Sequence, residues 1–144
     1  MVPTNYEDED DEDLEMDFEI DTEPSLTYAM HLSEDEPGIF LGKVDEEEAI
    51  RQMVFKTLST ERYESEIYSW SHGFEKADLR GKSLPYIMSE IPIRVNDALT
   101  VDDRIESCED FQFEKIGKKA LHVTFSVITT SADTIEGMEV EVEI

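Results

Sequence analysis

The sequence predicts an α+β fold in which two main helices pack on a small antiparallel β-sheet, preceded by a disordered acidic leader. Two segments, near residues 49–58 and 87–99, place apolar residues at intervals of three and four, the period of an amphipathic helix. From residue 102 onward, apolar and polar residues alternate, as in strands with one buried face. Residues 1–24 hold 12 acidic side chains and no basic one, so repulsion and a lack of apolar surface oppose folding there.

The chain therefore divides into a leader, residues 1–24, and a single domain, residues 25–144, which is long enough for one core. The leader has two interpretations. It is a solvated tail, or it is a segment that orders on the basic surface or sheet edge of a partner. The second interpretation comes from its strand-like alternation of acids with Leu14, Met16, Phe18 and Ile20.

The charge of the chain is strongly negative and unevenly distributed. The net charge is −25, of which residues 1–48 carry −18 and residues 49–144 only −7. This balance argues against nucleic acids and anionic membranes as partners, because both are bound through Lys and Arg. No apolar run approaches the roughly 18 residues of a membrane span, and the N-terminus lacks signal-peptide features. Cys108 is the only cysteine, which predicts no internal disulfide and a reducing, cytosolic origin.

Residues 25–44 are predicted to form a β-hairpin. Apolar residues at alternate positions from Leu26 to Leu32 give the first strand one apolar face. The polar stretch 33–38 contains Pro37 and Gly38 and is the predicted turn, and residues 39–44 return. His31 falls on the outer face, where a lone histidine is more often solvated than bound to metal.

Asp45 is the predicted N-cap of the first helix, with Glu48 at the reciprocal capping-box position. Ser59-Thr60 is expected to close this helix. Its buried face is predicted to comprise Ala49, Ile50, Met53, Val54 and Leu58.

Residues 60–77 show no clean period, and we expect a loop with a short extended piece at 67–70. Gly73 permits a backbone turn there that other residues resist. Four aromatic residues of this loop have two interpretations, packing onto the core or contact with another protein: Tyr63, Tyr68, Trp70 and Phe74. Arg62 is expected to pair with Glu61 within the turn or to reach a carboxylate on a partner.

The second helix is expected to follow Ser83 as its cap, with Pro85 in the first turn. Pro92 falls in its middle and is expected to kink or split it, with a bend near Ser89–Glu90. The predicted buried stripe is Ile87, Ile91, Val95, Ala98 and Leu99.

Three strands are expected after residue 102. The first contains Ile105, Phe111 and Phe113, and the turn 117–119 leads to a strand at 121–128, where the period is clearest. Residues 131–133 break the pattern before a last strand through 138–144. That last strand is expected at an edge of the sheet, where its unpaired backbone groups are open to a partner strand.

The sequence contains no pattern that specifies catalysis, a cofactor or a metal. Glu61 with Asp78 or Glu75 could be drawn as the acid/base pair of a glycoside hydrolase. However, acids occupy about a quarter of all positions, so chance pairing is expected and surface charge is the simpler explanation. Supported nucleophile constellations, phosphate-binding glycine loops and EF-hand loops are all missing. We therefore predict that the chain is not an enzyme.

Three stretches carry a family resemblance: AIRQMVFKTLSTERYESEIYSWSHGFE at 49–75, the Leu-x-Gly-Lys turn at 79–82, and SLPYIMSEIPIRVNDALTVDDRIESCEDFQFE at 83–114. With them the chain resembles the XkdS-like baseplate proteins of PBSX-type contractile phage tails. More distantly, it is similar to the lysozyme-like baseplate wedge subunits and to TssE of type VI secretion. The resemblance covers about residues 25–144 and implies an α+β wedge-like domain.

The resemblance implies a structural subunit that docks wedge proteins and helps to initiate or anchor the sheath. Its implied partners are other wedge proteins, inner tube or hub proteins and the first sheath ring. It implies assembly in the host cytoplasm and a final place in the baseplate. The relatives have a Thr/Gly-Glu-Arg turn and a later Phe-Gly-like element, matched here by Thr60-Glu61-Arg62 and, in altered order, by His72-Gly73-Phe74. The proline of the wedge family's Glu-Pro-Arg turn is missing. The implied protein interface is Thr60, Glu61, Arg62, Tyr68, Trp70 and Gly73.

Two alternative functions are set beside this one. The acidic leader suggests an adaptor or regulatory protein that mimics nucleic acid. The lysozyme label of the wedge family suggests peptidoglycan cleavage, which no residue pattern supports.

Overall fold

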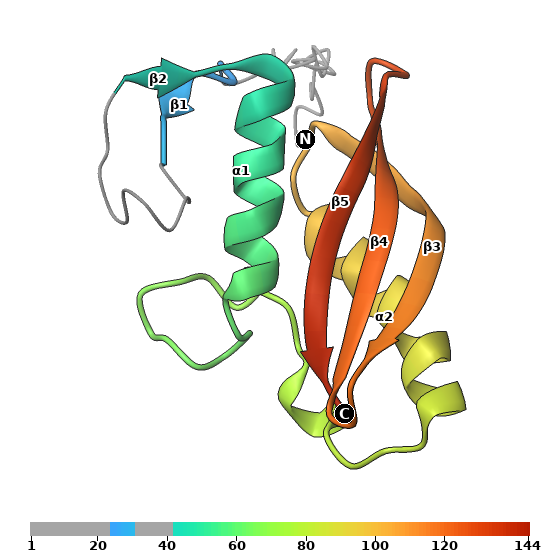
Figure 1. Ribbon diagram of the computed structural model, residues 1–144. Coiled ribbons are helices and arrows are strands. Elements are labelled where there is room, and N and C mark those ends of the chain that lie inside the picture. The colour runs from blue at the N-terminus through green and yellow to red at the C-terminus, as the bar shows by residue number, and fades with distance from the viewer. Residues whose placement is uncertain (1–23, 31–41) are drawn as a thin grey trace, which may run out of the picture.

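The computed structural model describes residues 24–30 and 42–144. They form a mixed α+β fold with two antiparallel sheets, where the sequence predicted one. Figure 1 shows α1 beside β5 and α2 behind the three-stranded sheet. In chain order the elements are β1 (Thr27–Tyr28), β2 (Lys43–Val44), α1 (Glu46–Ser59), the 3₁₀ helix η1 (Ala77–Leu79), α2 (Leu84–Leu99), β3 (Ile105–Ile116), β4 (Ala120–Thr129) and β5 (Thr134–Glu143).

The larger sheet has the order β3-β4-β5, so β5 is an edge strand, as predicted. Its register pairs Phe113 with Val123 and Val123 with Val140 across the three strands. The predicted alternation is confirmed, because the apolar positions of β4 and β5 are buried and the glutamates of β5 are exposed. The register shifts between Glu109 and Gln112 mark an irregularity in β3.

Helix α1 begins as predicted, with the Asp45 carboxylate accepting a hydrogen bond of 2.8 Å from the Glu46 N–H. The predicted capping box does not form among the described residues, because the Asp45 carboxylate accepts from Glu46 and not from the Glu48 N–H, and Glu48 makes no return bond to Asp45. The predicted buried face is confirmed for Ala49, Ile50, Val54 and Leu58.

Helix α2 runs from Leu84 to Leu99 without interruption, so the predicted split at Pro92 is wrong. Pro92 cannot donate to the carbonyl of Met88, but Met88 lies on the exposed side of the helix, where water can take the donor's place. The whole predicted stripe from Ile87 to Leu99 is buried and anchors the helix on both sides of the proline. The bend expected near Ser89–Glu90 stays a prediction.

The buried residues of α1, α2 and β3–β5 form one hydrophobic cluster. Phe74, from the segment between the helices, is also completely buried in it. The segment between α1 and α2 is therefore tied to the core at Phe74, and this tie positions the candidate site.

The small sheet pairs Thr27 with Val44 and confirms that 25–44 folds back on itself. The predicted turn 33–38, the leader and His31 lie outside the described residues. The strands are much shorter than predicted, and the expected apolar face is not buried, since Leu26 and Tyr28 are exposed. The Gln52 side chain of α1 holds the first strand instead, donating to Tyr28 O at 2.8 Å and accepting from Met30 N at 2.7 Å.

Candidate protein interface

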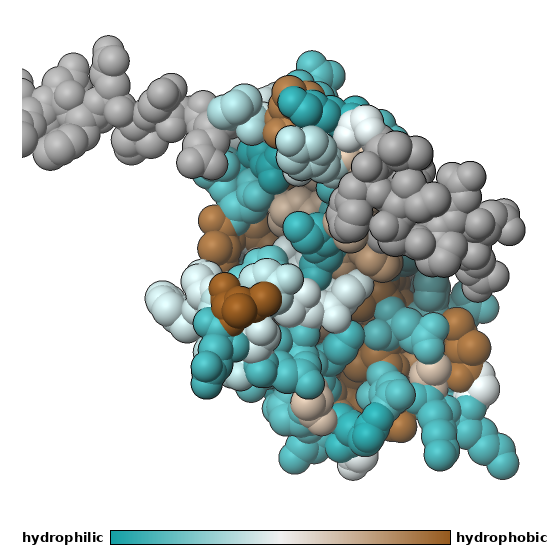
Figure 2. Space-filling view, turned by 90° about the vertical axis from the view of Figure 1, so that its left-hand side faces the viewer, coloured by the Kyte–Doolittle hydropathy of each residue, from teal (hydrophilic) through white to brown (hydrophobic). Residues whose placement is uncertain are grey.

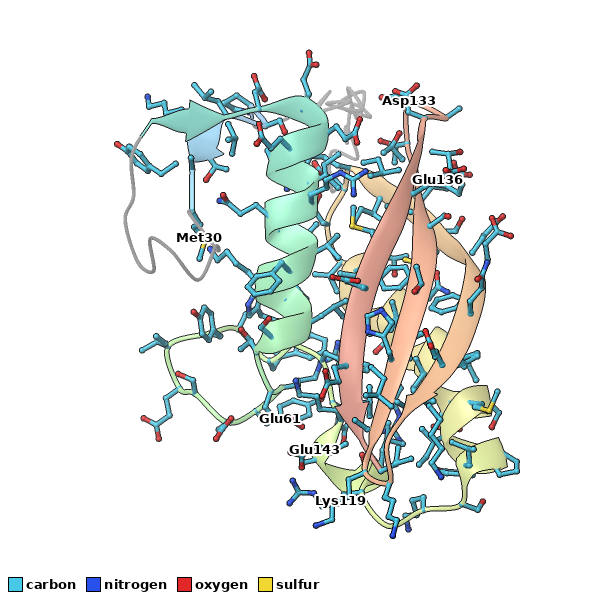
Figure 3. All side chains as sticks on the ribbon, viewed as in Figure 1. Met30, Glu61, Lys119, Asp133, Glu136 and Glu143 are labelled. Atoms are coloured by element: carbon cyan, nitrogen blue, oxygen red, sulfur yellow. The ribbon has the colours of Figure 1, made fainter. Side chains whose placement is uncertain are left out.

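The predicted interface residues all lie in the segment that joins α1 to η1, residues 60–76. Figure 3 shows Glu61 at the lower end of α1, close to the end of β5 that carries Glu143. The segment leaves α1, forms a wide loop and returns to the same level, where Glu61 and Phe74 form an isolated β-bridge. Each predicted residue can therefore be assigned to the closure of this loop or to its exposed part.

Thr60 closes the loop at its base. Its hydroxyl donates to Lys56 O at 2.8 Å and so satisfies one of the free carbonyls at the end of α1. Its own carbonyl accepts the Phe74 N–H at 2.8 Å. Because Phe74 is buried in the core, this bond fixes the returning strand of the loop against the end of the helix.

The side chain of Glu61 binds backbone groups of a later segment of the same chain. One carboxylate oxygen accepts the backbone N–H groups of Lys76 and Ala77, both at 3.1 Å. These two N–H groups open η1, where no other side chain caps the helix. The carboxylate therefore acts as a distant N-cap, and it suits the positive end of the short helix.

Arg62 is largely buried, with 11% of its side chain exposed. It donates to the carbonyls of Gly73 at 3.2 Å and Ser71 at 3.5 Å and forms an ion pair of 2.9 Å with Asp97 of α2. Within the chain, Arg62 thus pairs with a third group, Asp97, and not with Glu61, while contact with a partner's carboxylate stays a prediction. The guanidinium spans the loop and ties it to α2, using the planar fork that lysine lacks.

Gly73 is required by the close approach of the two loop strands. Its φ is +103°, and a Cβ atom there would lie 2.9 Å from Thr60 O and 3.0 Å from Arg62 N. Both contacts are with backbone atoms, which cannot move without opening the loop. The predicted turn at Gly73 is confirmed, and its physical reason is this packing as well as the positive φ. We call Thr60, Glu61, Arg62 and Gly73 the clasp.

The far part of the loop exposes large apolar side chains. Ile67 is 85% exposed, Trp70 78% and Tyr63 67%, and Tyr68 is exposed and stacked on His72 with 4.5 Å between ring centroids. The predicted extended piece at 67–70 is wrong, because these residues form turns, with Tyr68 N bonded to Ser65 O. Figure 2, which faces this side of the molecule, shows an isolated strongly hydrophobic group among hydrophilic ones. Ile67 was missed as an interface candidate because no period distinguishes exposed from buried positions in this loop.

Some aromatic residues of the loop pack onto the core and others are exposed, so each of the two interpretations, core packing and contact with another protein, fits part of the set. Phe74 packs in the core, and Tyr63 and Trp70 face solvent. His72 is partly buried, and its Nε2 atom is buried without a hydrogen-bond partner among the described residues. Burial, and secondarily the nearby charge of Lys56, lower the pKa of His72.

A second arginine holds the other side of this segment. Arg94 of α2 donates to both oxygens of Asp78, to the Glu75 carbonyl at 3.1 Å and to Glu90 at 3.2 Å. Its hydrogen bond lowers the pKa of Asp78, which therefore stays ionised and is a poor proton donor. The acid/base pair that could be drawn from Glu61 and Asp78 thus consists of two carboxylates with structural partners.

Among residues 24–30 and 42–144, no group of three or more potential metal ligands comes together. No helix in this part of the chain is both long enough and apolar enough to cross a membrane.

Comparison with known proteins identifies the family. Residues 16–132 match the model of the contractile injection system sheath initiator. The chain belongs to the sheath initiator family. It is also 38% identical over 137 residues to the phage-like element PBSX protein XkdS of Bacillus subtilis (strain 168), a match that covers 90% of each chain. The resemblance to XkdS-like proteins is confirmed, and with it a structural role in a contractile tail, at the start of the sheath. In this sheath initiator, the Thr-Glu-Arg turn is part of the clasp.

Proposed function

We propose that this sheath initiator docks on wedge proteins of the baseplate through the exposed part of the 60–76 loop, and offers the edge of β5 to the first ring of sheath. Residues 25–144 are the docking unit in this proposal, and residues 1–24 are an extension of it. The proposal includes no catalytic step. It is supported by one observation above all, the exposure of Ile67 and Trp70 on a loop whose base is fixed by the clasp.

In this proposal the predicted interface residues have two different roles. Thr60, Glu61, Arg62 and Gly73 hold the loop in one shape, and Tyr68 and Trp70 belong to the surface that contacts the partner. Trp and Tyr dominate the energetics of many interfaces, and a loop ordered before binding loses less entropy when it docks. Contact by the clasp residues themselves stays a prediction.

The choice of β5 over β3 as the edge that receives a strand is supported by a difference between these two outer strands of the sheet. At β3, the amide of Asn96 accepts from Cys108 N at 2.8 Å and donates to Cys108 O at 3.1 Å. A side chain of α2 thus occupies backbone groups that an added strand would need. Register shifts interrupt β3 at two places, whereas the shift between β4 and β5 falls between Ile135 and Met138, outside the C-terminal part of β5. The edge of β5 is the better site for strand addition.

The docking surface is tested by replacing Ile67 and Trp70 together with serine in cells that assemble the tail. Because both side chains are exposed, stability should change by no more than about 0.5 kcal/mol each. We expect the variant to fold and to be missing from purified tails. The matched control replaces Ile93 and Val101, which are 64% and 57% exposed outside the loop. Normal incorporation of the loop variant, or equal failure of the control, would contradict the proposal.

Charge reversal at Glu61 or Arg62 is a less direct test. Either change removes bonds that close the loop, so failed assembly would follow from a disordered loop as well as from a lost contact. Substitution at Ile67 and Trp70 leaves the clasp intact.

A further inference from the structure

A groove runs along the C-terminal half of the β5 edge. It consists of two cavities of about 320 and 440 Å³ that adjoin, since both are lined by Lys76 and Glu141. One wall is β5 from Glu139 to Glu143, with His122 of β4 beside it on the same face. The opposite wall is the end of α1, with Phe55 and Leu58, followed by the start of η1. Figure 1 shows this end of α1 beside the lower part of β5.

The two faces of β5 differ sharply in chemistry along this groove. Glu139, Glu141 and Glu143 are exposed on one face, whereas Val140 and Val142 are buried on the other. A strand that pairs with β5 continues the pleat, so its side chains alternate between the same two faces. One set would lie beside the glutamates, and the other beside Val140 and the exposed ring of Phe55.

The basic residues of the opposite wall do not neutralise this acidic face completely. Lys76 Nζ donates to the Leu58 carbonyl at 3.3 Å, and Arg80 forms an ion pair with Glu143. Glu139 lies beside the His122 ring, with 3.3 Å between Nε2 and the carboxylate, and within the part of the chain that the structure describes it forms no ion pair with a lysine or an arginine. Glu139 and Glu141 therefore supply the negative charge that an incoming strand meets.

We propose that the strand received by this groove belongs to a different protein and alternates basic with apolar residues. The proposal rests on strand addition at β5, as given under the proposed function, and adds the chemistry of the partner. Opposite charges on directly opposed or diagonal positions stabilise strand pairs, and like charges destabilise them. The apolar residues of the added strand extend the cluster around Val140 and Phe55.

The chain's own leader does not meet this requirement. Its alternating segment Leu14–Ile20 has the strand period but places Glu15, Asp17 and Glu19 where basic residues are needed. The leader of a second copy would be repelled by Glu139 and Glu141. This segment therefore provides a natural acidic control.

The test uses two labelled peptides with the purified full-length protein. One is Leu14–Ile20 itself, and the other carries lysine at positions 15, 17 and 19. Fluorescence anisotropy measures affinity, and amide hydrogen exchange shows where each peptide binds. We expect the lysine peptide to bind at least about tenfold more tightly and to slow exchange at 139–143 of β5. A peptide of the same composition, with its lysines grouped at one end, controls for general attraction to a chain of charge −25.

Matched variants locate the effect on the protein. Glu139→Lys with Glu141→Lys should reverse the preference between the two peptides. Glu106→Lys with Glu114→Lys, at exposed positions on β3, makes the same change in net charge and should leave the preference unchanged. Equal effects of the two double variants, or equal binding of the grouped peptide, would overturn the proposal.

A serine-substituted alternating peptide separates this proposal from the one on which it rests. If it protects β5 as well as the lysine peptide does, strand addition stands and the requirement for basic residues falls. If no alternating peptide protects β5, strand addition at this edge falls, and the present proposal falls with it. Docking through Ile67 and Trp70 is unaffected by either result.

Discussion

Replacing Gly73 with alanine tests the clasp most directly. The residue has a φ of +103°, a conformation that costs a residue with a Cβ about 1–3 kcal/mol. The new Cβ would also lie 2.9 Å from the Thr60 carbonyl oxygen, which accepts the Phe74 N–H at 2.8 Å. Moving that oxygen away weakens a hydrogen bond worth about 1 kcal/mol. We therefore expect Gly73→Ala to lower the free energy of unfolding by about 2–4 kcal/mol.

Gly81→Ala provides the matched control for this experiment. Gly81 also has a positive φ, +81°, but no atom lies within 4 Å of the position of its added Cβ. Its substitution should therefore cost only the backbone strain, about 1–2 kcal/mol.

The measurement is urea unfolding of both variants and of the unmodified chain, followed by far-UV circular dichroism. The fluorescence of Trp70, the only tryptophan, reports the same loop during the titration. A Gly73→Ala variant that loses no more stability than Gly81→Ala would show that the close contact with Thr60 and Arg62 is not a constraint. The clasp would then be refuted as the element that shapes the loop.

Three further predictions follow from single side chains. The pKa of His72 is lowered in the folded protein, so its contribution to stability is complete above pH 6.5 and is lost as pH falls below that value. His72→Gln should remove this part of the pH dependence in unfolding titrations. Cys108 is buried, and burial raises the pKa of its thiol to about 12. A thiol reagent should therefore react with it only at the rate at which the chain opens. Asn96→Asp should lower the free energy of unfolding by about 1–3 kcal/mol, measured in urea, because a carboxylate oxygen would replace the donor to Cys108 O. An Asn96→Asp variant as stable as the unmodified chain would contradict the proposed blocking of β3.

The regular elements could be predicted from the sequence because each has a period set by its own geometry. The stripe from Ile87 to Leu99 and the alternation in β4 describe faces that must be buried, and they are. The predicted split at Pro92 was wrong because local propensity does not include the anchoring of α2 on both sides of the proline. The length of the strands in the small sheet was overestimated because alternation alone does not show that a segment lies against a core. Leu26 and Tyr28 alternate as in a strand with one buried face, but both are exposed.

The loop could not be predicted in the same way because its order comes from contacts distant in sequence. Arg62 reaches Asp97 across 35 positions, and Glu61 caps a helix that begins 16 residues later. Such pairings leave no periodic signal. The types of these residues made them interface candidates, but their spacing did not show which of them would close the loop.

Both side chains of the Glu-Arg turn bind groups of their own chain and hold the loop closed. The donors of Arg62 go to Gly73, Ser71 and Asp97, and the accepting oxygen of Glu61 goes to the start of η1. The Asp97 partner is solvent-exposed, so this ion pair alone contributes less than about 1 kcal/mol, and the bonds to backbone carry most of the effect. The loop is closed at its base by these bonds and at Phe74 by the core. Most of the entropic cost of ordering the loop is therefore met during folding, so the proposed docking through Ile67 and Trp70 would not have to overcome it. Losses at the clasp should consequently appear as disorder of the loop before they appear as lost contacts with a partner.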